Sequence, residues 1–500
     1  MDHHPPRHAP LAMDATTFRA IGHGLVDRLA DVLASVPDRP VTRGQSPSAV
    51  RAALDLSGPL PQQGSDPGEL IARTAELLVD HSLFNAHPRF FGYITAPPAP
   101  IGILGDFLAA AINANVGAWT LSPAATEIES QTVRWIAEFI GYPTTCGGLL
   151  VTGGNMANIV GFLAARAAKA GWDVRTEGVA SGRRLLAYAS AETHTWIQKA
   201  ADLAGIGTAS VRWIPTDARL RMDVAALRRQ VDEDVASGHQ PFVVVGTAGS
   251  VSTGAVDPLG AIADFCAERG LWFHVDGAYG GFAATVHGAP AGLRELARAD
   301  SVAVDPHKWL YAPLEAGCAL VRDPEALRAA FAYHPPYYHF DERATNFVDY
   351  GPQNSRGFRA LKVWLALRHA GAGGYRQMIA DDIRLSRALA DAVARETGLE
   401  LMTQELSITT FRCVPADLRS RIGEGPVDAH LDTLNREVLD RLQRGGELFV
   451  SNAVVGGRYV LRACIVNFHT QEQDVEALPA IVARVAGAVD AELRVARQVI

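Results

Sequence analysis

Short apolar runs alternate with amphipathic stretches through the middle of the chain, from about residue 148 to about residue 325. The runs are continuously apolar, which is typical of strands buried on both faces of a sheet. The stretches between them space their apolar residues as a helix does. The pattern therefore predicts an α/β domain with a mostly parallel sheet that helices cover on both faces. Its strands are predicted in GLLVTGG, RRLLAYAS, SVRWIP, PFVVVGTAG, LWFHVDGAYGG and ADSVAVDPH.

The two ends of the chain are patterned differently from the middle. Helical spacing dominates up to about Ala96, with one Pro- and Gly-rich interruption, SGPLPQQGSDPG. The tail contains fewer and shorter strands, in LSITTFRCV, ELFVSNAVV and YVLRACIVNF, separated by helices. Because 500 residues exceed what one hydrophobic core usually serves, we predict three units. They are a helical N-terminal segment (1–98), a large α/β domain (99–371) and a small α+β domain (372–500).

Composition and charge narrow the class of protein. The hydrophobic fraction of 48% and the charged fraction of 20% are those of a globular protein. A formal net charge of -8 argues against a nucleic-acid partner, which would require a basic face. No apolar run is long enough to span a membrane, and MDHHPPRHAP lacks the apolar core of a secretory signal. The five cysteines are scattered without a CxxC pair, which favours reduced cysteines in a cytoplasmic protein and no metal site.

The first candidate site is a glycine-rich turn in LLVTGGNMAN. A predicted strand ends at Thr152, and a helix begins near Asn155 after Gly153 and Gly154. Backbone N–H groups at such a helix N-terminus attract a phosphate. A tight strand-to-helix turn needs glycine in any case, so the turn alone fits a phosphate site and a structural role equally well.

Two charged residues stand at the ends of predicted strands. Asp276 ends FHVD, where it either braces a loop or pairs with a protonated ring nitrogen. Lys308 lies in SVAVDPHKWLYAP, where it either extends its amine to solvent or acts in a dry site as a Schiff-base nucleophile. Ligands of parallel sheets bind beyond the carboxyl ends of the strands. The turn, the aspartate and the lysine together are the parts of a pyridoxal phosphate site.

In its motifs the chain resembles the pyridoxal-phosphate-dependent group II decarboxylases, the aromatic L-amino acid decarboxylase family of fold type I. The resemblance covers roughly residues 80 to 470. Its marks are HPRFFGYI, SPAATEIE, TGGNMAN, THTWIQKA, HVDGAYGG, DPHKWL and SRGFRALKVW, of which the aspartate–lysine pair with HKW is highly specific. The resemblance implies a fold type I enzyme with pyridoxal 5'-phosphate as cofactor. It also implies a homodimer in which the N-terminal helices pack across the two-fold axis.

The resemblance assigns a role to each site residue. Lys308 would hold the cofactor as a Schiff base, and Asp276 would keep its pyridine nitrogen protonated. Ala278 and His194 would pack on opposite faces of the ring. The phosphate would lie among Gly153, Gly154, Asn155 and His307.

Two positions depart from the pattern of the relatives. Asp305 stands where relatives often carry an asparagine that contacts the phosphate, and a carboxylate there would repel the phosphate. Val251 lies where relatives have a threonine-rich run, and its side chain cannot donate a hydrogen bond. We therefore expect Ser250 or Ser252 to make that contact.

A long stretch from Phe331 to Ser355 is rich in proline and tyrosine and has little periodicity, which predicts a lid over the site. In the resembled family a mobile loop here carries a tyrosine that protonates the substrate Cα. Tyr337 and Tyr338 both fit, and Tyr337 has the better spacing from the proline. Either ring could instead be an anchor that holds the loop closed.

The implied reaction is decarboxylation of an L-amino acid, an aromatic one, to the amine and carbon dioxide. Phe91 and Tyr93 would form apolar walls of the substrate pocket. Ser355 favours phenylalanine, tyrosine or dihydroxyphenylalanine over tryptophan. The alternatives are an aromatic aldehyde synthase, a carbon–carbon lyase acting on a phosphorylated amine, and a non-catalytic protein that holds the cofactor. His194 and a loop tyrosine argue against the synthase, and intact Lys308, Asp276 and His194 argue against the non-catalytic protein.

Overall fold

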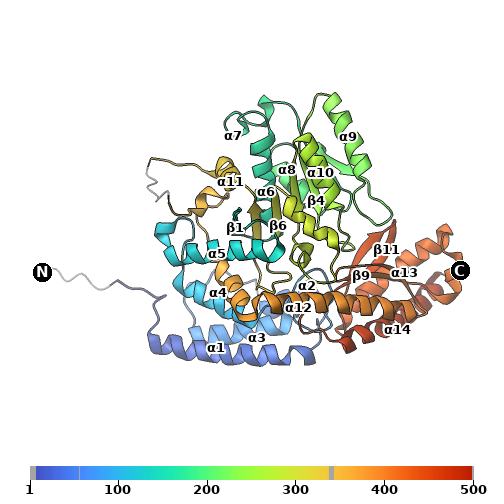
Figure 1. Cartoon of the computed structure of the whole chain (residues 1–500). Helices are drawn as coiled ribbons and strands as arrows, with labels where there is room; N and C mark the ends of the chain where they lie inside the picture. The colour runs from blue at the N-terminus through green and yellow to red at the C-terminus, as the bar shows by residue number, and fades with distance from the viewer. Residues whose placement is uncertain (1–6, 56, 337–342, 498–500) are drawn as a thin grey trace.

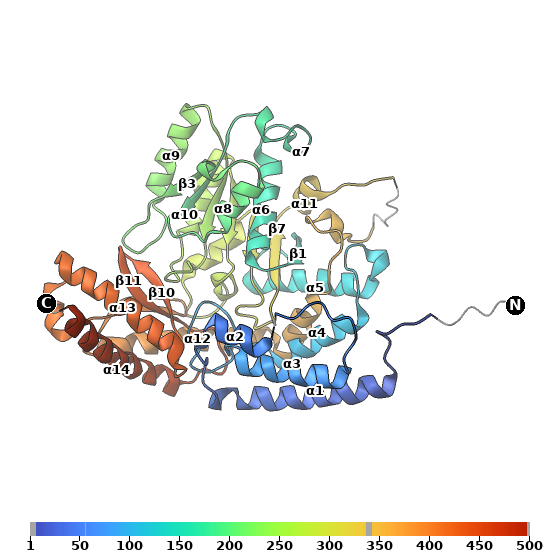
Figure 2. The ribbon, with the colours of Figure 1, turned by 180° about the vertical axis from the view of Figure 1, so that it is seen from behind.

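The computed structural model describes residues 7–55, 57–336 and 343–497, whose arrangement is shown in Figure 1. A domain built on a large sheet lies above a layer of N-terminal helices, and the C-terminal elements pack at one side of both (Figures 1 and 2). Within the described residues, no helix combines the length and the apolar character that crossing a membrane requires.

Seven strands of the described chain form the large sheet, in the order β1-β7-β6-β5-β4-β2-β3. Only β7 runs against the others: it pairs antiparallel with β1 and with β6. The prediction of a mostly parallel sheet is confirmed, and β7 is the strand that the prediction missed. The bounds are β1 (Gly147–Val151), β2 (Leu185–Ser190), β3 (Val211–Ile214), β4 (Gln240–Thr247), β5 (Trp272–Asp276), β6 (Ser301–Val304) and β7 (Gly317–Val321).

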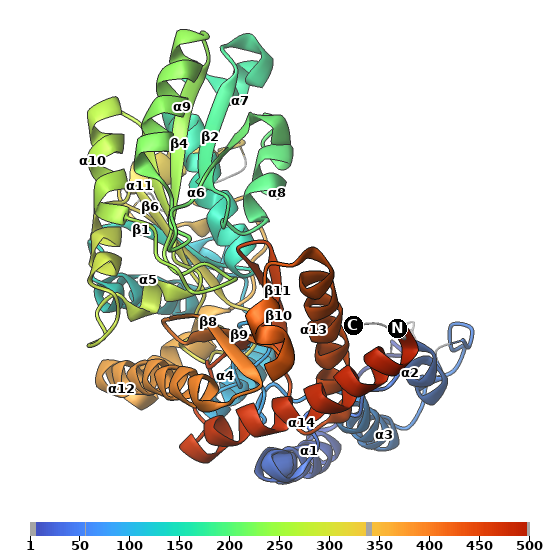
Figure 3. The same ribbon diagram turned by 90° about the vertical axis from the view of Figure 1, so that its right-hand side faces the viewer.

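The strands of this sheet send alternate side chains into two separate hydrophobic cores. In β4, Val243 and Val245 pack with α6 and α8, whereas Val244 packs with α9 and α10 on the opposite face (Figure 3). Because both faces are covered, neither set of alternate positions has to be polar, which explains the continuous apolar runs. The helices of this domain are α5 (Pro123–Ile140), α6 (Gly154–Lys169), α7 (Val174–Glu177), α8 (Trp196–Leu203), α9 (Val224–Ala236), α10 (Leu259–Arg269) and α11 (Pro324–Phe331).

The C-terminal part has a second, antiparallel sheet in the order β10-β11-β9-β8. Helices pack against it around an apolar core that includes Leu389, Phe411 and Leu461. The predicted α+β character is confirmed, although β8 was missed. The elements are α12 (Ala360–Arg395), β8 (Leu399–Glu405), β9 (Ile408–Cys413), α13 (Gly425–Gly445), β10 (Ser451–Val455), β11 (Arg458–Cys464) and α14 (Glu472–Arg497).

The helices of the N-terminal layer leave much of their apolar surface exposed. α1 lies beside α3 along the base of the molecule (Figures 1 and 2), and no side chain of α1 is buried. The bounds are α1 (Ala15–Ser35), α2 (Pro47–Leu54), α3 (Pro67–His81) and α4 (Pro100–Ile112). The division into three units stays a prediction. Its second boundary falls inside α12, at Gly371, where a φ of 66° interrupts the helix.

Candidate active site

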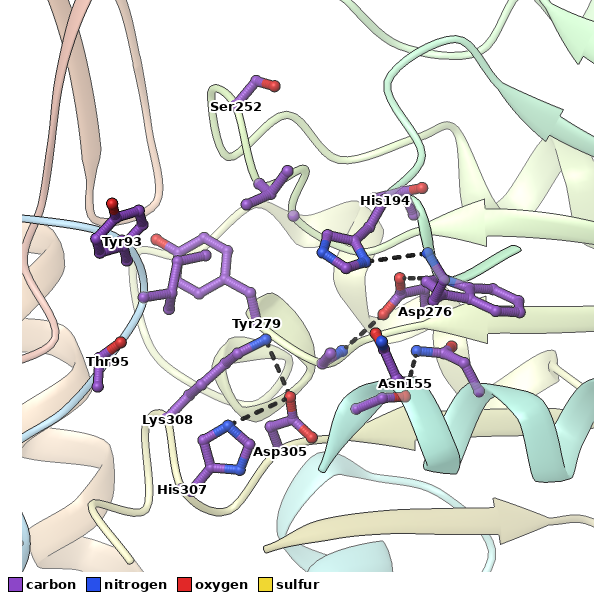
Figure 4. A pocket seen from close by; sticks show the side chains of 18 of the residues that line it. Tyr93, Thr95, Asn155, His194, Ser252, Asp276, Tyr279, Asp305, His307 and Lys308 are labelled. Atoms are coloured by element: carbon purple, nitrogen blue, oxygen red, sulfur yellow. Dashed lines mark hydrogen bonds and ion pairs between the residues drawn. The ribbon is translucent and has the colours of Figure 1, made fainter. Parts of the chain in front are cut away.

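A cavity of about 530 Å³ opens at the carboxyl ends of the parallel strands. Its walls come from three places: the strand ends of the large sheet, the segment from Tyr93 to Thr95, and the β10–β11 strands of the second sheet (Figure 4). The size is that of a small-molecule site. Because β1, β2, β4, β5 and β6 point the same way, residues from five distant parts of the chain meet at this edge.

Lys308 lies in the cavity on a tight turn that follows β6. Its N–H donates to the Asp305 carbonyl at 2.9 Å, and its Nζ lies 3.0 Å from Oδ2 of Asp305. Asp305 is 2% exposed, and its Oδ1 has no hydrogen-bond partner among the described residues. His307 also lines the cavity, 3.8 Å from the same carboxylate, and burial lowers its pKa. The lysine amine is thus held by a buried carboxylate that retains free acceptor capacity.

Asp276 ends β5 and presents its carboxylate to the same cavity. One oxygen accepts a hydrogen bond from the Trp196 indole N–H at 2.7 Å, and the other accepts from the Ala278 N–H at 3.1 Å. The two hydrogen bonds fix the orientation of the Asp276 carboxylate. Both donors are neutral, so neither compensates its negative charge. A buried carboxylate in this state favours a cationic partner.

His194 follows β2 and lines the cavity. Its Nδ1 accepts a hydrogen bond from the Trp196 N–H at 3.2 Å. Burial lowers the pKa of His194, and the nearby Asp276 carboxylate opposes that shift only in part. A neutral imidazole can pack on an aromatic ring without adding charge to the site.

The glycine turn between β1 and α6 borders the cavity and leaves no room for a side chain at Gly154. Gly153 has a φ of 86°, in the region that favours glycine. A Cβ at Gly154 would lie 2.5 Å from Oδ2 of Asp305. Thr152 and Asn155 line the cavity beside the turn, at the N-terminus of α6. The turn therefore offers backbone N–H groups to a phosphate at close range.

A buried hydrogen-bond chain links this turn to β5. Asn158 donates to the Gly154 carbonyl at 2.9 Å, and its Oδ1 lies 2.7 Å from Nε2 of His274. The other ring nitrogen of His274 lies 2.7 Å from the Ser301 hydroxyl. Burial lowers the pKa of His274 to about 4. The histidine is therefore neutral, and it couples the turn to the strand that carries Asp276.

Most predicted site residues meet in the cavity. Those that line it are Tyr93, Gly154, Asn155, His194, Asp276, Ala278, Asp305, His307 and Lys308. Gly153 shapes the turn without lining the cavity. Tyr337 and Tyr338 lie outside the described residues.

Three predicted residues do not line the cavity of this chain. Phe91 is fully buried in the core of the C-terminal part and forms no wall of the cavity. Ser250 is buried too, and its hydroxyl is engaged 3.1 Å from that of Thr253; Ser252 lines the cavity instead. Ser355 is exposed and is not a lining residue.

The prediction missed Arg462, which reaches the cavity from β11. The residue is 2% exposed, and its Nη1 donates to the Tyr93 carbonyl at 3.1 Å and to the Ser451 hydroxyl at 3.0 Å. Its Nε and Nη2 have no partner among the described residues. Such a buried guanidinium can hold an anion. The signal in the sequence was an arginine inside the apolar run YVLRACIV, which is unusual for a buried strand.

These residues fit pyridoxal phosphate on structural grounds. Lys308 supplies an amine, Asp276 supplies a carboxylate that can face a protonated ring nitrogen, and the turn at Gly154 supplies N–H groups for the phosphate. The site thus defines a pyridoxal-phosphate-dependent enzyme. The chain belongs to the pyridoxal-dependent decarboxylase family, whose conserved domain matches residues 47–414.

Individual relatives agree with the family. The chain is 32% identical to the aromatic-L-amino-acid decarboxylase of Bacillus atrophaeus over 475 residues, which cover 93% of this chain and 94% of that protein. It is 28% identical to the phenylacetaldehyde synthase of a Rosa hybrid cultivar over 477 residues, covering 93% and 92%. The crystal structure of Oryza sativa TDC with PLP and tryptamine is similar with a TM-score of 0.88 and 30% identity, covering 96% of this chain and 99% of that one. The cofactor is pyridoxal phosphate and the reaction class is amino acid decarboxylation.

Proposed function

We propose that the protein decarboxylates an aromatic L-amino acid to the amine and carbon dioxide. The observation that carries the proposal is that Lys308, Asp276 and His194 line one cavity together with the glycine turn. When bound, the cofactor supplies an electron sink for the electrons that a departing carboxylate leaves behind. The aromatic class is supported by the relatives, which include an aromatic-L-amino-acid decarboxylase and a complex with tryptamine.

Each residue would act on the bound cofactor or substrate in its own way. Lys308 would carry the cofactor, and the Asp276 carboxylate would stabilise a proton on the ring nitrogen, strongly so in a site with little water. Trp196 would keep that carboxylate aimed at the ring. His194 would pack on the ring face in its neutral form.

Arg462 would bind the carboxylate of the amino acid. Its two unpartnered nitrogens, Nε and Nη2, lie in a buried wall of the cavity, where a carboxylate accepts strong hydrogen bonds. The Tyr93 ring is 58% exposed in the same region and would contact the substrate side chain. The preference for phenolic substrates that Ser355 suggested stays a prediction.

One experiment tests the function directly. The purified protein is incubated with each of the twenty amino acids, and carbon dioxide, amine, aldehyde and peroxide are measured. We expect amine and carbon dioxide in equal amounts from one or more aromatic amino acids. Lys308→Ala should abolish both products. Lys362→Ala is the matched control, because Lys362 is also buried but pairs with Asp106 at 3.0 Å.

Covalent labelling tests the lysine independently of turnover. Borohydride reduction of the cofactor-loaded protein followed by peptide mapping should modify Lys308. A label on Lys199 or Lys362 in its place would refute the assignment.

The alternative of an aldehyde synthase is supported by two similarities, to phenylacetaldehyde synthase and to the structure of a 4-hydroxyphenylacetaldehyde synthase. A general acid that delivers a proton to Cα decides between amine and aldehyde. We expect Tyr337→Phe to retain substrate binding, to lower the amine yield and to produce aldehyde, ammonia and peroxide in air. Tyr338→Phe should change little. An unchanged amine-to-aldehyde ratio in both variants and in the double variant would exclude both tyrosines as the donor.

A homodimer and a cytoplasmic location complete the proposal. Large apolar side chains are exposed on the N-terminal helices, including Phe18 (56%), Leu78 (59%) and Phe107 (51%). Such a surface suits an obligate interface. Sedimentation at low micromolar concentration should give twice 53.4 kDa, and a fully active monomer would contradict the dimer. The cysteines are all free, which is consistent with a reducing compartment.

A further inference from the structure

Asp382 is a buried carboxylate that contacts the segment following Lys308. It belongs to α12 and is 2% exposed. Its Oδ2 accepts hydrogen bonds from the Trp309 indole N–H at 3.0 Å and from the Tyr311 hydroxyl at 2.8 Å. A single carboxylate oxygen on α12 therefore accepts hydrogen bonds from two side chains of the turn that carries Lys308.

The position of Asp382 is costly for the fold. Burial raises its pKa to about 7, and the hydrogen bonds from Tyr311 and Trp309 offset only part of that shift. The next largest influences on its pKa come from the Asn467 N–H and from Asp381, neither of which is a cation. A buried carboxylate without a cation is less favourable than an apolar residue of similar size. The stability of the fold alone therefore does not account for a carboxylate at this position.

Tyr311 is the first residue that Asp382 fixes. Its φ of 52° lies in the left-handed region, which an aromatic residue rarely adopts. Its N–H donates to the Lys308 carbonyl at 3.0 Å, and its own carbonyl accepts from Ala99 at 2.8 Å. A residue in this conformation persists only where its surroundings hold it. Asp382 anchors the far end of the Tyr311 side chain and so supports the strained end of the turn.

Trp309 is the second residue that Asp382 fixes. It is fully buried, and its ring stacks on Tyr279 with 4.7 Å between centroids and 28° between planes. Tyr279 lines the cavity and is itself held by the Ser407 hydroxyl at 2.7 Å. Through Trp309, Asp382 thus supports a wall of the active site as well as the lysine turn.

We propose that Asp382 is a positioning residue for Lys308. From α12 it fixes Trp309 and Tyr311, and through their backbone it sets where the lysine amine stands relative to the Asp276 carboxylate. Asp382 does not line the cavity, so it acts through orientation and not through contact with substrate or cofactor. The inference rests on the proposed role of Lys308 as the cofactor lysine.

The test compares the full-length Asp382→Leu and Asp382→Asn proteins with wild type. Ser386→Ala is the matched control, because Ser386 is fully buried about one turn further along α12 and bonds Thr409 of β9 at 2.9 Å instead of the lysine turn. Each protein is freed of cofactor and its thermal midpoint is recorded. Pyridoxal phosphate is then added without any amino acid. Visible absorbance and circular dichroism follow covalent attachment, and borohydride mapping identifies the lysine.

We expect Asp382→Leu to attach the cofactor about tenfold more slowly than wild type and to show an altered visible circular dichroism, because the amine is displaced. The attachment rate of Asp382→Asn should lie between those of Asp382→Leu and wild type, since its amide oxygen still accepts hydrogen bonds from Trp309 and Tyr311. Ser386→Ala should lose stability but keep the wild-type rate and spectrum.

If Asp382→Leu does not fold, Tyr311→Phe provides the same measurement by removing one of the two hydrogen bonds. A wild-type attachment rate and spectrum in Asp382→Leu, or in Tyr311→Phe where that variant replaces it, would overturn the proposal. A label on a lysine other than Lys308 in the wild type would overturn the proposed function instead. The two failures are therefore distinguishable.

Discussion

Gly154 is a position where the cofactor site leaves no room for a side chain. A Cβ there would lie 2.5 Å from Oδ2 and 3.0 Å from Oδ1 of Asp305. The same Oδ2 lies 3.0 Å from the Lys308 Nζ. In Gly154→Ala, either the carboxylate moves off the lysine by about half an ångström or more, or the start of α6 moves away from the turn. Both movements disturb groups that we expect to hold the cofactor.

The size of the effect follows from the cost of overpacking. Inserting a methyl group into a packed site costs about 1–3 kcal/mol. Since about 1.4 kcal/mol is a tenfold change in affinity, cofactor binding should weaken by about 5-fold to about 150-fold. Alanine is a better helix former than glycine by up to about 1 kcal/mol, which acts in the opposite direction on folding. The thermal midpoint of the cofactor-free protein should therefore fall by less than the overpacking alone would cause.

Absorbance titration of cofactor-free protein with pyridoxal phosphate measures this effect. Gly292→Ala is the matched control, because a Cβ at Gly292 would meet nothing within 4 Å. The decisive comparison repeats Gly154→Ala in an Asp305→Ala background, where the obstructing carboxylate is absent. There the substitution should cost little further affinity. A loss as large as in the wild-type background would refute the argument from the clash.

Other residues give expectations that can be measured in the same proteins. The unfolded chain protonates His274 below pH 6.5, whereas the folded protein does so only near pH 4; stability is therefore greatest above pH 6.5 and falls as the pH falls toward 4. When the pH is lowered from about 7.5 to about 5.5, the free energy of unfolding measured with urea should fall by about 1.3 kcal/mol more for wild type than for His274→Gln. For Ser301→Ala it should fall by as much as for wild type. Arg462→Met should raise the KM for the amino acid more than about tenfold without changing cofactor affinity, because a carboxylate loses its charged partner; an unchanged KM would contradict that role. Phe91→Ala should cost about 3–5 kcal/mol of stability and leave the substrate preference unchanged. A change in KM for some substrates and not others would show that Phe91 contacts the substrate.

The fold was largely predictable because its strands are buried on both faces. Continuous apolar runs at β2, β4 and β5 can only be satisfied between two layers of helices. The same reasoning found no signal for β8, whose side chains are mostly only partly buried, since a strand at the edge of its sheet has no such requirement. β7 was missed although it is fully buried, because no helix separates it from β6 and it therefore falls outside the alternation of strands and helices.

The strand-end residues of the site were predictable for a related reason. A parallel sheet brings the ends of its strands to one edge whatever the loops do, so Asp276 and Lys308 had to be neighbours. Residues outside that rule were harder to place. Phe91 and Tyr93 stand two apart, as on one face of a strand, but Tyr93 has a φ of 52° and the backbone turns there, leaving Phe91 in the core and Tyr93 in the cavity.

The chemistry of the site was readable from the chain: a lysine, a carboxylate and a glycine turn at the ends of apolar strands predict the cofactor, because periodicity and local spacing do not depend on how the units pack. Which distant residues lie at the site depends on the three-dimensional packing. Arg462 and Asp382 follow the large sheet by many residues; Arg462 lines the cavity and Asp382 contacts the turn after β6. No local pattern records which side chain of one unit will lie against a turn of another. That depends on how two finished surfaces fit together.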